Sequence, residues 1–167
     1  SCMGYEIAGA WGARIAQMES EPDRDTVVFT GDGSYLLMNS DIYSSVLSEK
    51  KLIILVLDNG GFAVINKLQN NMGGESFNNL IADCPTIPSP FAVDFAAHAA
   101  AMGATSETVA SPAELADAFK RAQASDKTYV IAMQVDPYDG WTAEGHTWWE
   151  VGTPEVSNKE SVNSAHA

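Results

Sequence analysis

Two short polar segments hold the side chains in this chain most suited to bind a metal ion. Gly31-Asp32-Gly33 follows the apolar run 26–30, and Asp58-Asn59-Gly60-Gly61 follows the apolar run 52–57. The runs predict buried parallel strands, and open α/β sheets bind ligands beyond the carboxyl ends of their strands. We therefore expect both segments to be tight turns that open onto one crevice, where oxygens of Asp32 and Asn59 share one hard cation.

Gly31-Asp32-Gly33-Ser34 is a weak signal by itself, because such turns also follow strands for conformational reasons alone. On this motif alone we favour an ordinary turn. The dinucleotide fingerprint lacks its third glycine, and no Gly-Lys-Ser or Gly-Lys-Thr is present. The two common nucleotide motifs are therefore not found.

The composition favours one globular domain with small-molecule or protein partners. Of the 167 residues 46% are apolar and 19% are charged, and the net charge is −13. This acidity argues against a nucleic-acid or anionic-membrane surface. The sequence has no apolar stretch near the ~20 residues of a membrane span. Its cysteines, Cys2 and Cys84, form no disulfide framework, so we expect a cytoplasmic protein.

Hydrophobic periodicity predicts alternating strands and helices, which is typical of a doubly wound parallel sheet with helices on both faces. Ser111-Pro112-Ala113-Glu114 is a capping box with proline at the first helical position. We expect a cofactor-binding domain over 1–135 and a tail over 136–167, which is a lid or an interdomain contact. The predicted helices are 3–18, 39–48, 62–68, 91–102 and 112–124; the predicted strands are 26–30, 52–57, 105–109 and 128–135; 70–90 is a candidate functional loop.

The distribution of basic residues suggests how a phosphate group would be held. No Lys or Arg lies between Arg24 and Lys50, so the turn at Asp32 has no basic sequence neighbour. Mg²⁺ prefers octahedral oxygen ligation and commonly combines a carboxylate with phosphate oxygens. A divalent cation would therefore bridge the acidic protein and a diphosphate. Glycine backbone N–H groups and a helix beginning beyond Ser34 would add favourable positive potential.

Taken together, the two segments resemble the thiamine diphosphate motif, in which GDG is followed after about two dozen residues by an asparagine pair. The resemblance implies that Asp32, Asn59 and the main-chain carbonyl of Gly61 bind the Mg²⁺ that holds the cofactor's diphosphate. It also implies cofactor contacts at Gly31, Gly33, Ser34 and Phe62. One departure is Asp58 in place of the first asparagine, a position that is not the side-chain ligand in the family.

The opening segment is similar to a helix that precedes GDG in acetolactate-synthase-like enzymes. It contains Ser1-Cys2-Met3-Gly4-Tyr5, with Cys2 as an extra or substituted position. The resemblance implies that Met3 lies by the aminopyrimidine ring of the cofactor. Met3 as simple core filler at a helix start is the alternative.

Within this family, two segments resemble trihydroxycyclohexane-1,2-dione hydrolases of inositol breakdown: the run 58–69 and the tail from Gly145 to Ser157. The resemblance implies hydrolytic opening of a small cyclic 1,2-dione. It also implies a glutamate from a separate N-terminal domain of a partner subunit, so we expect the chain to be a fragment of a homo-oligomeric enzyme, without catalytic residues of its own and inactive alone. The alternatives are acetolactate synthase or another carboligase or decarboxylase, and a non-enzymatic metal or phosphate-binding module.

Three further predictions concern side chains outside the two turns. Trp141, Trp148 and Trp149 with His146 form either a lid over the substrate or contact surface for missing domains. His98 is predicted to be a packing or surface residue. Cys84 is assigned no role.

Overall fold

A computed structural model describes residues 2–71, 73–89, 91–138, 160 and 163–164. The chain divides into two compact units. The sheet unit comprises residues 1–58 and 93–135, and the loop unit comprises residues 59–92 and 136–167.

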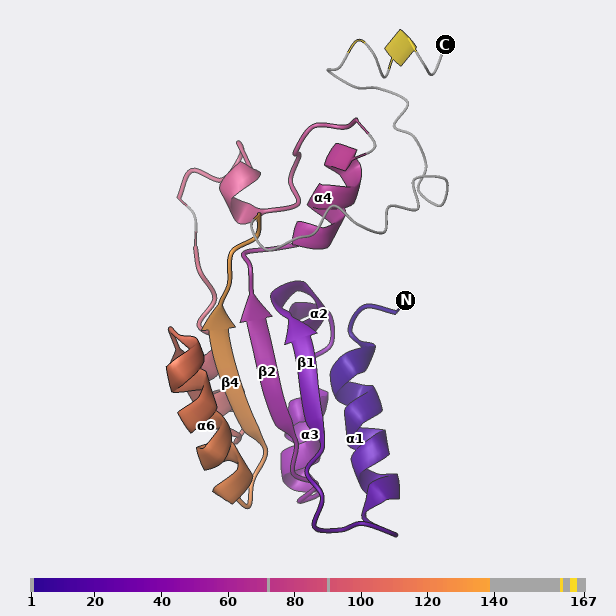
Figure 1. Cartoon of the computed structure of the whole chain (residues 1–167), viewed down its shortest axis with the longest axis vertical. Coiled ribbons are helices and arrows are strands. Elements are labelled where there is room, and N and C mark those ends of the chain that lie inside the picture. Colours follow the sequence, from indigo (N-terminus) through magenta and orange to yellow (C-terminus); the bar gives the residue numbers. More distant parts are fainter. Residues whose placement is uncertain (1, 72, 90, 139–159, 161–162, 165–167) are drawn as a thin grey trace. The chain divides into compact units, whose positions relative to one another are not determined.

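The sheet unit contains four strands and five helices among its described residues, and the loop unit contains one α-helix and one 3₁₀ helix between residues 59 and 92 (Figure 1). In the sheet unit the elements are α1 (Tyr5–Gln17), β1 (Val27–Gly31), α2 (Asp32–Leu37), α3 (Asp41–Leu47), β2 (Ile53–Asp58), α5 (Phe95–Ala101), β3 (Thr105–Val109), α6 (Pro112–Ala124) and β4 (Tyr129–Gln134). In the loop unit they are α4 (Ala63–Asn71) and the 3₁₀ helix η1 (Ile81–Asp83).

The four strands form one parallel sheet in the order β1-β2-β4-β3. Parallel strands need crossover connections, which the intervening helices provide. Strand β2 is buried over its first four residues, as expected of a central strand covered on both faces. The predicted doubly wound α/β fold with helices on both faces is confirmed.

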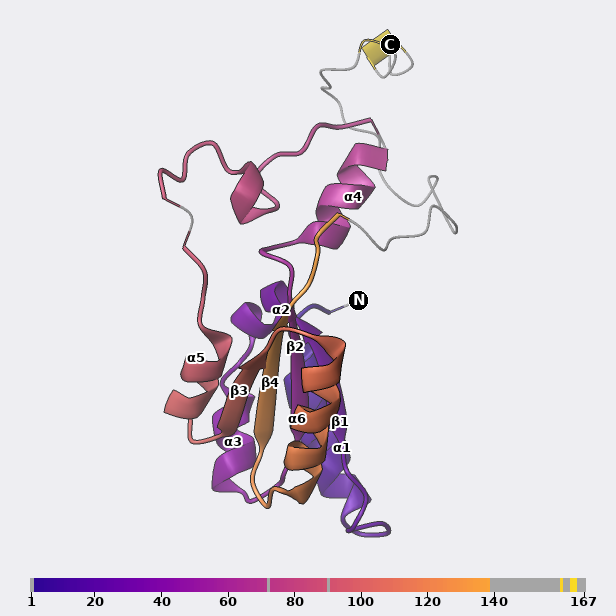
Figure 2. The ribbon, with the colours of Figure 1, turned by 60° about the vertical axis from the view of Figure 1, so that its left-hand side comes forward.

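The two faces of the sheet carry separate hydrophobic cores. One core joins α1, α3 and α5 to the sheet through buried residues such as Ile7, Ile42 and Phe95. The other core joins α6, through Ala118 and Ala122, to the opposite face. Figure 2 shows α6 in front of the sheet and α1 behind it. Among the described residues of the sheet unit, three helices and the short α2 therefore cover one face, and one helix covers the other.

A buried network of polar groups lies at the amino end of the sheet. The hydroxyls of Ser45 and Thr128 are 2.8 Å apart, and Ser45 also donates to the carbonyl of Ile42 at 2.7 Å. The N–H of Leu52 donates to Thr128 Oγ1 at 3.2 Å. Because buried polar groups are costly when unpaired, this network fixes α3 against the starts of β2 and β4.

Most predicted helix boundaries agree with the structure to within a few residues. Helix α6 spans the predicted residues, and the N–H of Glu114 donates to its cap, Ser111, at 3.2 Å. Helix α5 begins four residues later than expected, because the Asp94 side chain caps it by accepting from the N–H of Ala97 at 2.9 Å. The sequence analysis missed α2, and the predicted helix 39–48 is α3.

The loop unit is built around a short antiparallel contact. Gly61 and Leu80 form an isolated β-bridge, the N–H of Phe62 donates to Asn79 O at 2.7 Å, and the N–H of Ile81 donates to Gly60 O at 2.9 Å. The candidate loop 70–90 thus returns onto the residues that follow β2. It includes the 3₁₀ helix η1, whose backbone bonds supply local order.

Candidate functional site

Asp32 lies at a junction between a strand and a helix. Strand β1 ends at Gly31, and α2 begins at Asp32 without an intervening turn. The predicted tight turn at Gly31-Asp32-Gly33, and the predicted helix start beyond Ser34, are therefore wrong. The junction buries Asp32 to 4% exposure and Ser34 to 8%. A carboxylate held at the carboxyl end of a strand is the type of ligand that a hard cation takes.

Tyr35 fixes the helix that carries Asp32. Its side chain is fully buried, and its ring packs edge-on against Phe95 with centroids 5.2 Å apart. Its hydroxyl lies 2.9 Å from Nδ1 of His98, and burial raises the pKa of Tyr35 to about 12. Helix α2 is thereby tied to α5. His98 is exposed, and its ring also contacts the Tyr35 ring edge-on, so it lies at the surface while it holds Tyr35.

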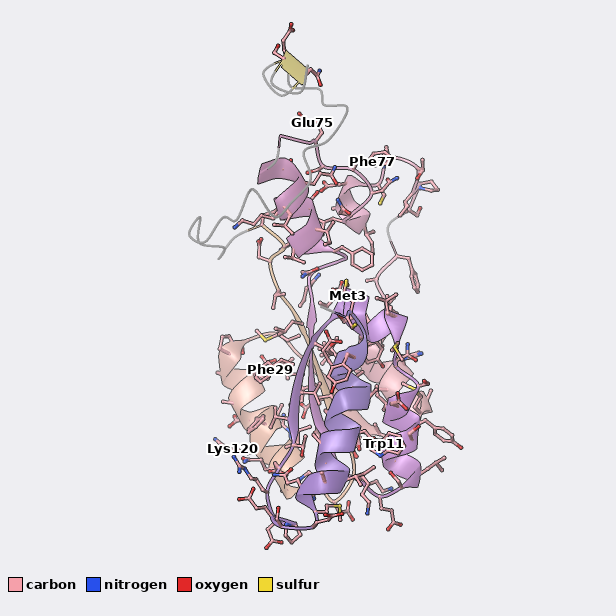
Figure 3. The ribbon with its side chains drawn as sticks, turned by 90° about the vertical axis from the view of Figure 1, so that its right-hand side faces the viewer. Met3, Trp11, Phe29, Glu75, Phe77 and Lys120 are labelled. Carbon is pink, nitrogen blue, oxygen red and sulfur yellow. The ribbon has the colours of Figure 1, made fainter. Side chains whose placement is uncertain are left out.

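The segment around Met3 lies beside the end of α2. Gly4 has φ +93° and precedes α1, and a Cβ at Gly4 would come within 2.9 Å of Met38 Cγ. Glycine is therefore required at this position by both backbone conformation and packing. Met3 itself is 39% exposed at the same end of the sheet unit as α2 (Figure 3).

Strands β1 and β2 are parallel and both finish at the carboxyl end of the sheet. Gly31 pairs in register with Leu57, so Asp32 is one residue past this pair and Asn59 is two residues past it along the chain. The N–H of Val135 donates to Asp58 O at 2.8 Å and holds the last residue of β2 against the end of β4. Asn59 is then the first residue of the loop unit.

The residues after Asn59 adopt backbone conformations that favour glycine. Gly60 has φ +79° and Gly61 has φ +147°, and a Cβ at Gly61 would lie 2.3 Å from Asn79 O. The chain bends at Gly60, and the bridge between Gly61 and Leu80 fixes the shape of this segment. Phe62 is partly exposed and precedes α4.

Basic side chains of the sheet unit gather at the opposite end from Asp32. Arg14 donates to the carbonyls of Pro22 and Arg24, and Lys51 forms an ion pair with Asp25 at 3.0 Å. These groups lie next to the starts of β1 and β2, and Arg24, Lys50, Lys51 and Lys127 each lie two or three residues before a strand begins. Among the described residues of the sheet unit, no Lys or Arg lies in the segments at the carboxyl end of β1.

The carboxyl end of β1 offers an oxygen ligand at Asp32 and open space at Gly31. Gly31 has extended backbone, φ −81°, and a Cβ there would meet no atom within 4 Å. Neither conformation nor packing within the described structure requires glycine at this position, which suits close approach by a ligand. No cluster of three or more His, Cys, Asp or Glu side chains able to hold a metal occurs in the described part of the chain. An ion at this edge would therefore need amide, carbonyl or phosphate oxygens beside Asp32.

Helix α4 contains a polar residue that the sequence analysis missed. Ala63 and Asn66 are its buried residues, whereas Phe62, Ile65 and Leu68, which set the predicted helical rhythm, are more than one-third exposed. Within the described residues, Oδ1 of the buried Asn66 has no hydrogen-bond partner. Asn66 is therefore a further candidate for ligand contact. The sequence analysis missed it because the predicted inward face was chosen from the apolar residues of the helix.

The remaining predictions are resolved only in part. Cys84 Sγ donates to Leu80 O at 3.1 Å inside the loop unit, which is a local structural contact. Trp141, His146, Trp148 and Trp149 lie outside the described residues. Within the described residues, no helix combines the length and apolar character of a membrane span.

Comparisons with known proteins identify a family and close relatives. Residues 1–133 match the model described as "Thiamine pyrophosphate enzyme, C-terminal TPP binding domain". A 3D-(3,5/4)-trihydroxycyclohexane-1,2-dione hydrolase of Bacillus cereus is 38% identical over 99% of this chain, and one of Listeria monocytogenes is 37% identical over the same share. The chain spans about a quarter of these relatives' length, 26% and 25% respectively.

Solved structures show the same fold. A thiamine diphosphate-dependent 4-hydroxybenzoylformate decarboxylase from Rhodococcus jostii superposes with a TM-score of 0.66 at 23% identity, over 80% of this chain and 23% of that one. A benzoylformate decarboxylase from Polynucleobacter necessarius gives a TM-score of 0.65 at 23% identity, over 81% and 24%. At this identity the likeness bears on the fold alone.

Proposed function

Because this chain belongs to the thiamine pyrophosphate enzyme family, as its C-terminal TPP-binding domain, we propose that its sheet edge holds thiamine diphosphate through one Mg²⁺ ion. The observation that carries the proposal is the register of β1 and β2, which pairs Gly31 with Leu57. The buried Asp32 and the segment that begins at Asn59 therefore follow adjacent parallel strands at their carboxyl ends. The absence of Lys and Arg from that edge of the described sheet unit is a second support.

The proposed ligands are Asp32, Asn59 and the main-chain carbonyl of Gly61. They would offer one carboxylate, one amide and one carbonyl oxygen, and oxygen ligands of these types are what Mg²⁺ prefers. Gly31, Gly33 and Ser34 would line the diphosphate, because Gly31 leaves open space and Ser34 is a buried hydroxyl. Met3 and Phe62 are the proposed apolar contacts to the rest of the cofactor.

Thiamine diphosphate, when bound, supplies a nucleophilic carbon and an electron sink for cleavage of a carbon–carbon bond next to a carbonyl. The residues of this chain bind and orient it. Asp32 holds the metal from a helix start anchored by Tyr35, and the bridge between Gly61 and Leu80 holds the turn that carries the other ligands. We assign no catalytic residue to the chain, and groups that act on substrate belong to the rest of the polypeptide or to a second subunit.

For the whole enzyme we propose hydrolysis of a small cyclic 1,2-dione, as in the trihydroxycyclohexane-1,2-dione hydrolases. The support is 36–38% identity to eight proteins with this name over 99% of the chain. We further propose that the domain works with N-terminal domains in a cytoplasmic homo-oligomer. No observation favours acetolactate synthase over this assignment.

Calorimetry on the complete polypeptide tests cofactor binding. Thiamine diphosphate is titrated with Mg²⁺ present and with the metal chelated, for the unaltered enzyme and for Asp32→Asn. We expect Mg²⁺-dependent binding that Asp32→Asn weakens by about 100-fold, since metal binding depends on the charged ligand. Asp117→Asn removes an exposed carboxylate on α6 and should leave binding unchanged. Equal binding with and without metal would refute the proposal.

Product analysis tests the reaction class. The complete enzyme is incubated with a cyclic 1,2-dione and separately with pyruvate, and ring-opened acid and carbon dioxide are measured. Ring opening without decarboxylation is expected. Decarboxylation or carboligation of pyruvate alone would establish the rival carboligase assignment, and cofactor binding without turnover of either substrate would favour a non-enzymatic module.

A further inference from the structure

One side chain of α4, that of Gln69, holds both ends of the segment 75–79. Its Nε2 donates to the main-chain carbonyl of Glu75, and its Oε1 accepts from Nδ2 of Asn79 at 2.9 Å. The two partners lie six and ten residues after Gln69 in the chain. Glu75, labelled in Figure 3, lies near the end of α4. The amide of Gln69 therefore closes this segment into a loop against its own helix.

The chain returns onto Gln69 immediately after α4. The N–H of Gly74 donates to the main-chain carbonyl of Gln69 at 2.9 Å, and Gly74 is buried. A Cβ at Gly74 would come within 2.8 Å of Gln69 Cγ, so the returning backbone lies directly on this side chain. The position of the Gln69 amide is therefore set by packing as well as by its hydrogen bonds.

Asn79 connects Gln69 to the segment that follows β2. Its side chain is bonded to Gln69, whereas its main-chain carbonyl accepts from the N–H of Phe62 at 2.7 Å. The next residue, Leu80, forms the β-bridge to Gly61. Any loosening of Asn79 from α4 would therefore reach the peptide group between Gly61 and Phe62.

This peptide group contains the main-chain carbonyl of Gly61. A trans peptide is planar, and no cis peptide occurs in the described chain, so the C=O of Gly61 points opposite to the N–H of Phe62. Since that N–H donates to Asn79, the carbonyl oxygen of Gly61 is directed away from Asn79. Gly60 and Gly61 would let this peptide group rotate if it were not held, because glycine adopts many backbone conformations. The hydrogen bond to Asn79 therefore sets the direction of the carbonyl.

We propose that Gln69 is a positioning residue for the metal site and acts on it through Asn79. The inference rests on the proposed function, in which the carbonyl of Gly61 is a ligand of Mg²⁺. Gln69 holds Asn79, Asn79 holds the N–H of Phe62, and the shared peptide group directs the carbonyl to the ion. Mg²⁺ demands near-ideal octahedral geometry, whereas Ca²⁺ accepts flexible geometry. Loss of the Gln69 amide should therefore harm Mg²⁺ binding more than Ca²⁺ binding.

Calorimetry on the complete polypeptide with two metals tests the proposal. Thiamine diphosphate is titrated with Mg²⁺ and separately with Ca²⁺, for the unaltered enzyme and for Gln69→Met, which keeps the length of the side chain and removes both hydrogen bonds. We expect the affinity with Mg²⁺ to fall by about tenfold, as for residues that orient a metal ligand, and the affinity with Ca²⁺ to fall less. An unchanged ratio of the two affinities in Gln69→Met would overturn the proposal.

Asn70→Leu is the matched control on the same helix. Nδ2 of Asn70 donates to Ser76 Oγ at 3.0 Å and to the carbonyl of Asn66 at 2.8 Å. The variant therefore loosens the same loop and leaves the hydrogen bond between Gln69 and Asn79 in place. Its ratio of Mg²⁺ to Ca²⁺ affinities should match that of the unaltered enzyme, whatever its stability. An equal change of the ratio in both variants would indicate general loosening of the loop and refute the positioning role.

A double-mutant cycle tests whether Gln69 acts through Asn79. Asn79→Ala removes Nδ2 and keeps the main-chain carbonyl that accepts from Phe62. The ratio of Mg²⁺ to Ca²⁺ affinities in the double variant should equal that in Gln69→Met alone, whereas changes that multiply would contradict the proposed route.

The unaltered enzyme separates failure of this inference from failure of the proposed function. If it binds thiamine diphosphate equally well with the metal chelated, the proposed function fails and the inference fails with it. If its binding depends on metal and Gln69→Met keeps the ratio of affinities, only the positioning role is refuted.

Discussion

The two ends of the sheet unit differ in how they use polar residues. At the amino end, Ser45 and Thr128 are hydrogen-bonded to each other, and Lys51 is paired with Asp25. At the carboxyl end, Asp32 and Ser34 are buried at the start of a short helix, and Gly31 leaves open space. The amino end is thus closed by paired groups that stabilise the fold, whereas the carboxyl end is where we propose that the ligand binds.

The largest expected effect comes from removing one carboxylate at each end. In the complete enzyme, Asp32→Ala should weaken Mg²⁺-dependent cofactor binding by about 100-fold, because the metal loses its charged ligand. Asp25→Ala should leave that affinity unchanged and lower the free energy of unfolding by about 1 kcal/mol, because its ion pair with Lys51 is only partly exposed. Calorimetry and denaturant unfolding measure the two quantities. Similar loss of affinity in both variants would remove the distinction between the ends.

The turn after β2 should tolerate no side chain at its second glycine. Gly61→Ala forces a non-glycine residue to φ +147° and brings its Cβ against Asn79 O. We expect the free energy of unfolding of the complete enzyme to fall by about 1–3 kcal/mol. Cofactor binding should also weaken. Gly12→Ala is the control, because a Cβ there meets no atom within 4 Å, and helix propensity predicts a gain of about 1 kcal/mol. A Gly61→Ala enzyme as stable as the unaltered one would show that the turn is free to change shape.

The buried network at the amino end should affect stability alone. Thr128→Val removes the hydroxyl that pairs with Ser45 and accepts from the N–H of Leu52. The expected loss is about 1–3 kcal/mol, the cost of leaving buried groups unpaired. Cofactor affinity, measured below the melting transition, should remain unchanged. A shift in affinity without a shift in stability would mean that the amino end takes part in binding.

The smallest effect concerns Glu107 on β3. The hydrogen bond from Arg121 is the main cause that lowers the pKa of Glu107 below its ordinary value of 4.5; burial opposes it, and the hydrogen bond from Tyr129 adds to the lowering. The folded state therefore favours the charged form, which contributes stability above pH 4.5 that is lost as the pH falls through the lowered pKa. Glu107→Gln should reduce stability slightly at pH 7 and make the acid side of the stability curve shallower. Parallel curves for the two proteins between pH 3 and 7 would contradict this assignment.

The sequence predicted the fold class well because strong local signals agree with the tertiary structure. The apolar run of β2 and the capping box of α6 both lie where periodicity and capping rules place them. Helix α2 was missed because it has six residues, contains one glycine, and is held by the burial of Tyr35 rather than by an amphipathic pattern. Burial is a tertiary effect, so local sequence does not report it.

The local backbone around the proposed ligands was predicted only in part. Asp32 and the glycines after Asn59 were identified from their spacing, and Gly60 and Gly61 have the backbone conformations that a turn requires. The buried Asn66 was missed because apolar neighbours dominated the helical pattern. The uneven helix cover of the sheet was also not foreseen, since strand order depends on crossovers between distant segments.

A double-mutant cycle on Asp32 and Asn59 tests the central claim, that both residues hold one metal ion. Mg²⁺-dependent cofactor affinity of the complete enzyme is measured for Asp32→Ala, for Asn59→Ala and for the double variant. If the two side chains share one ion, the double variant should lose little more affinity than Asp32→Ala alone, because the ion is already lost. Losses that multiply, as for independent sites, would contradict the account.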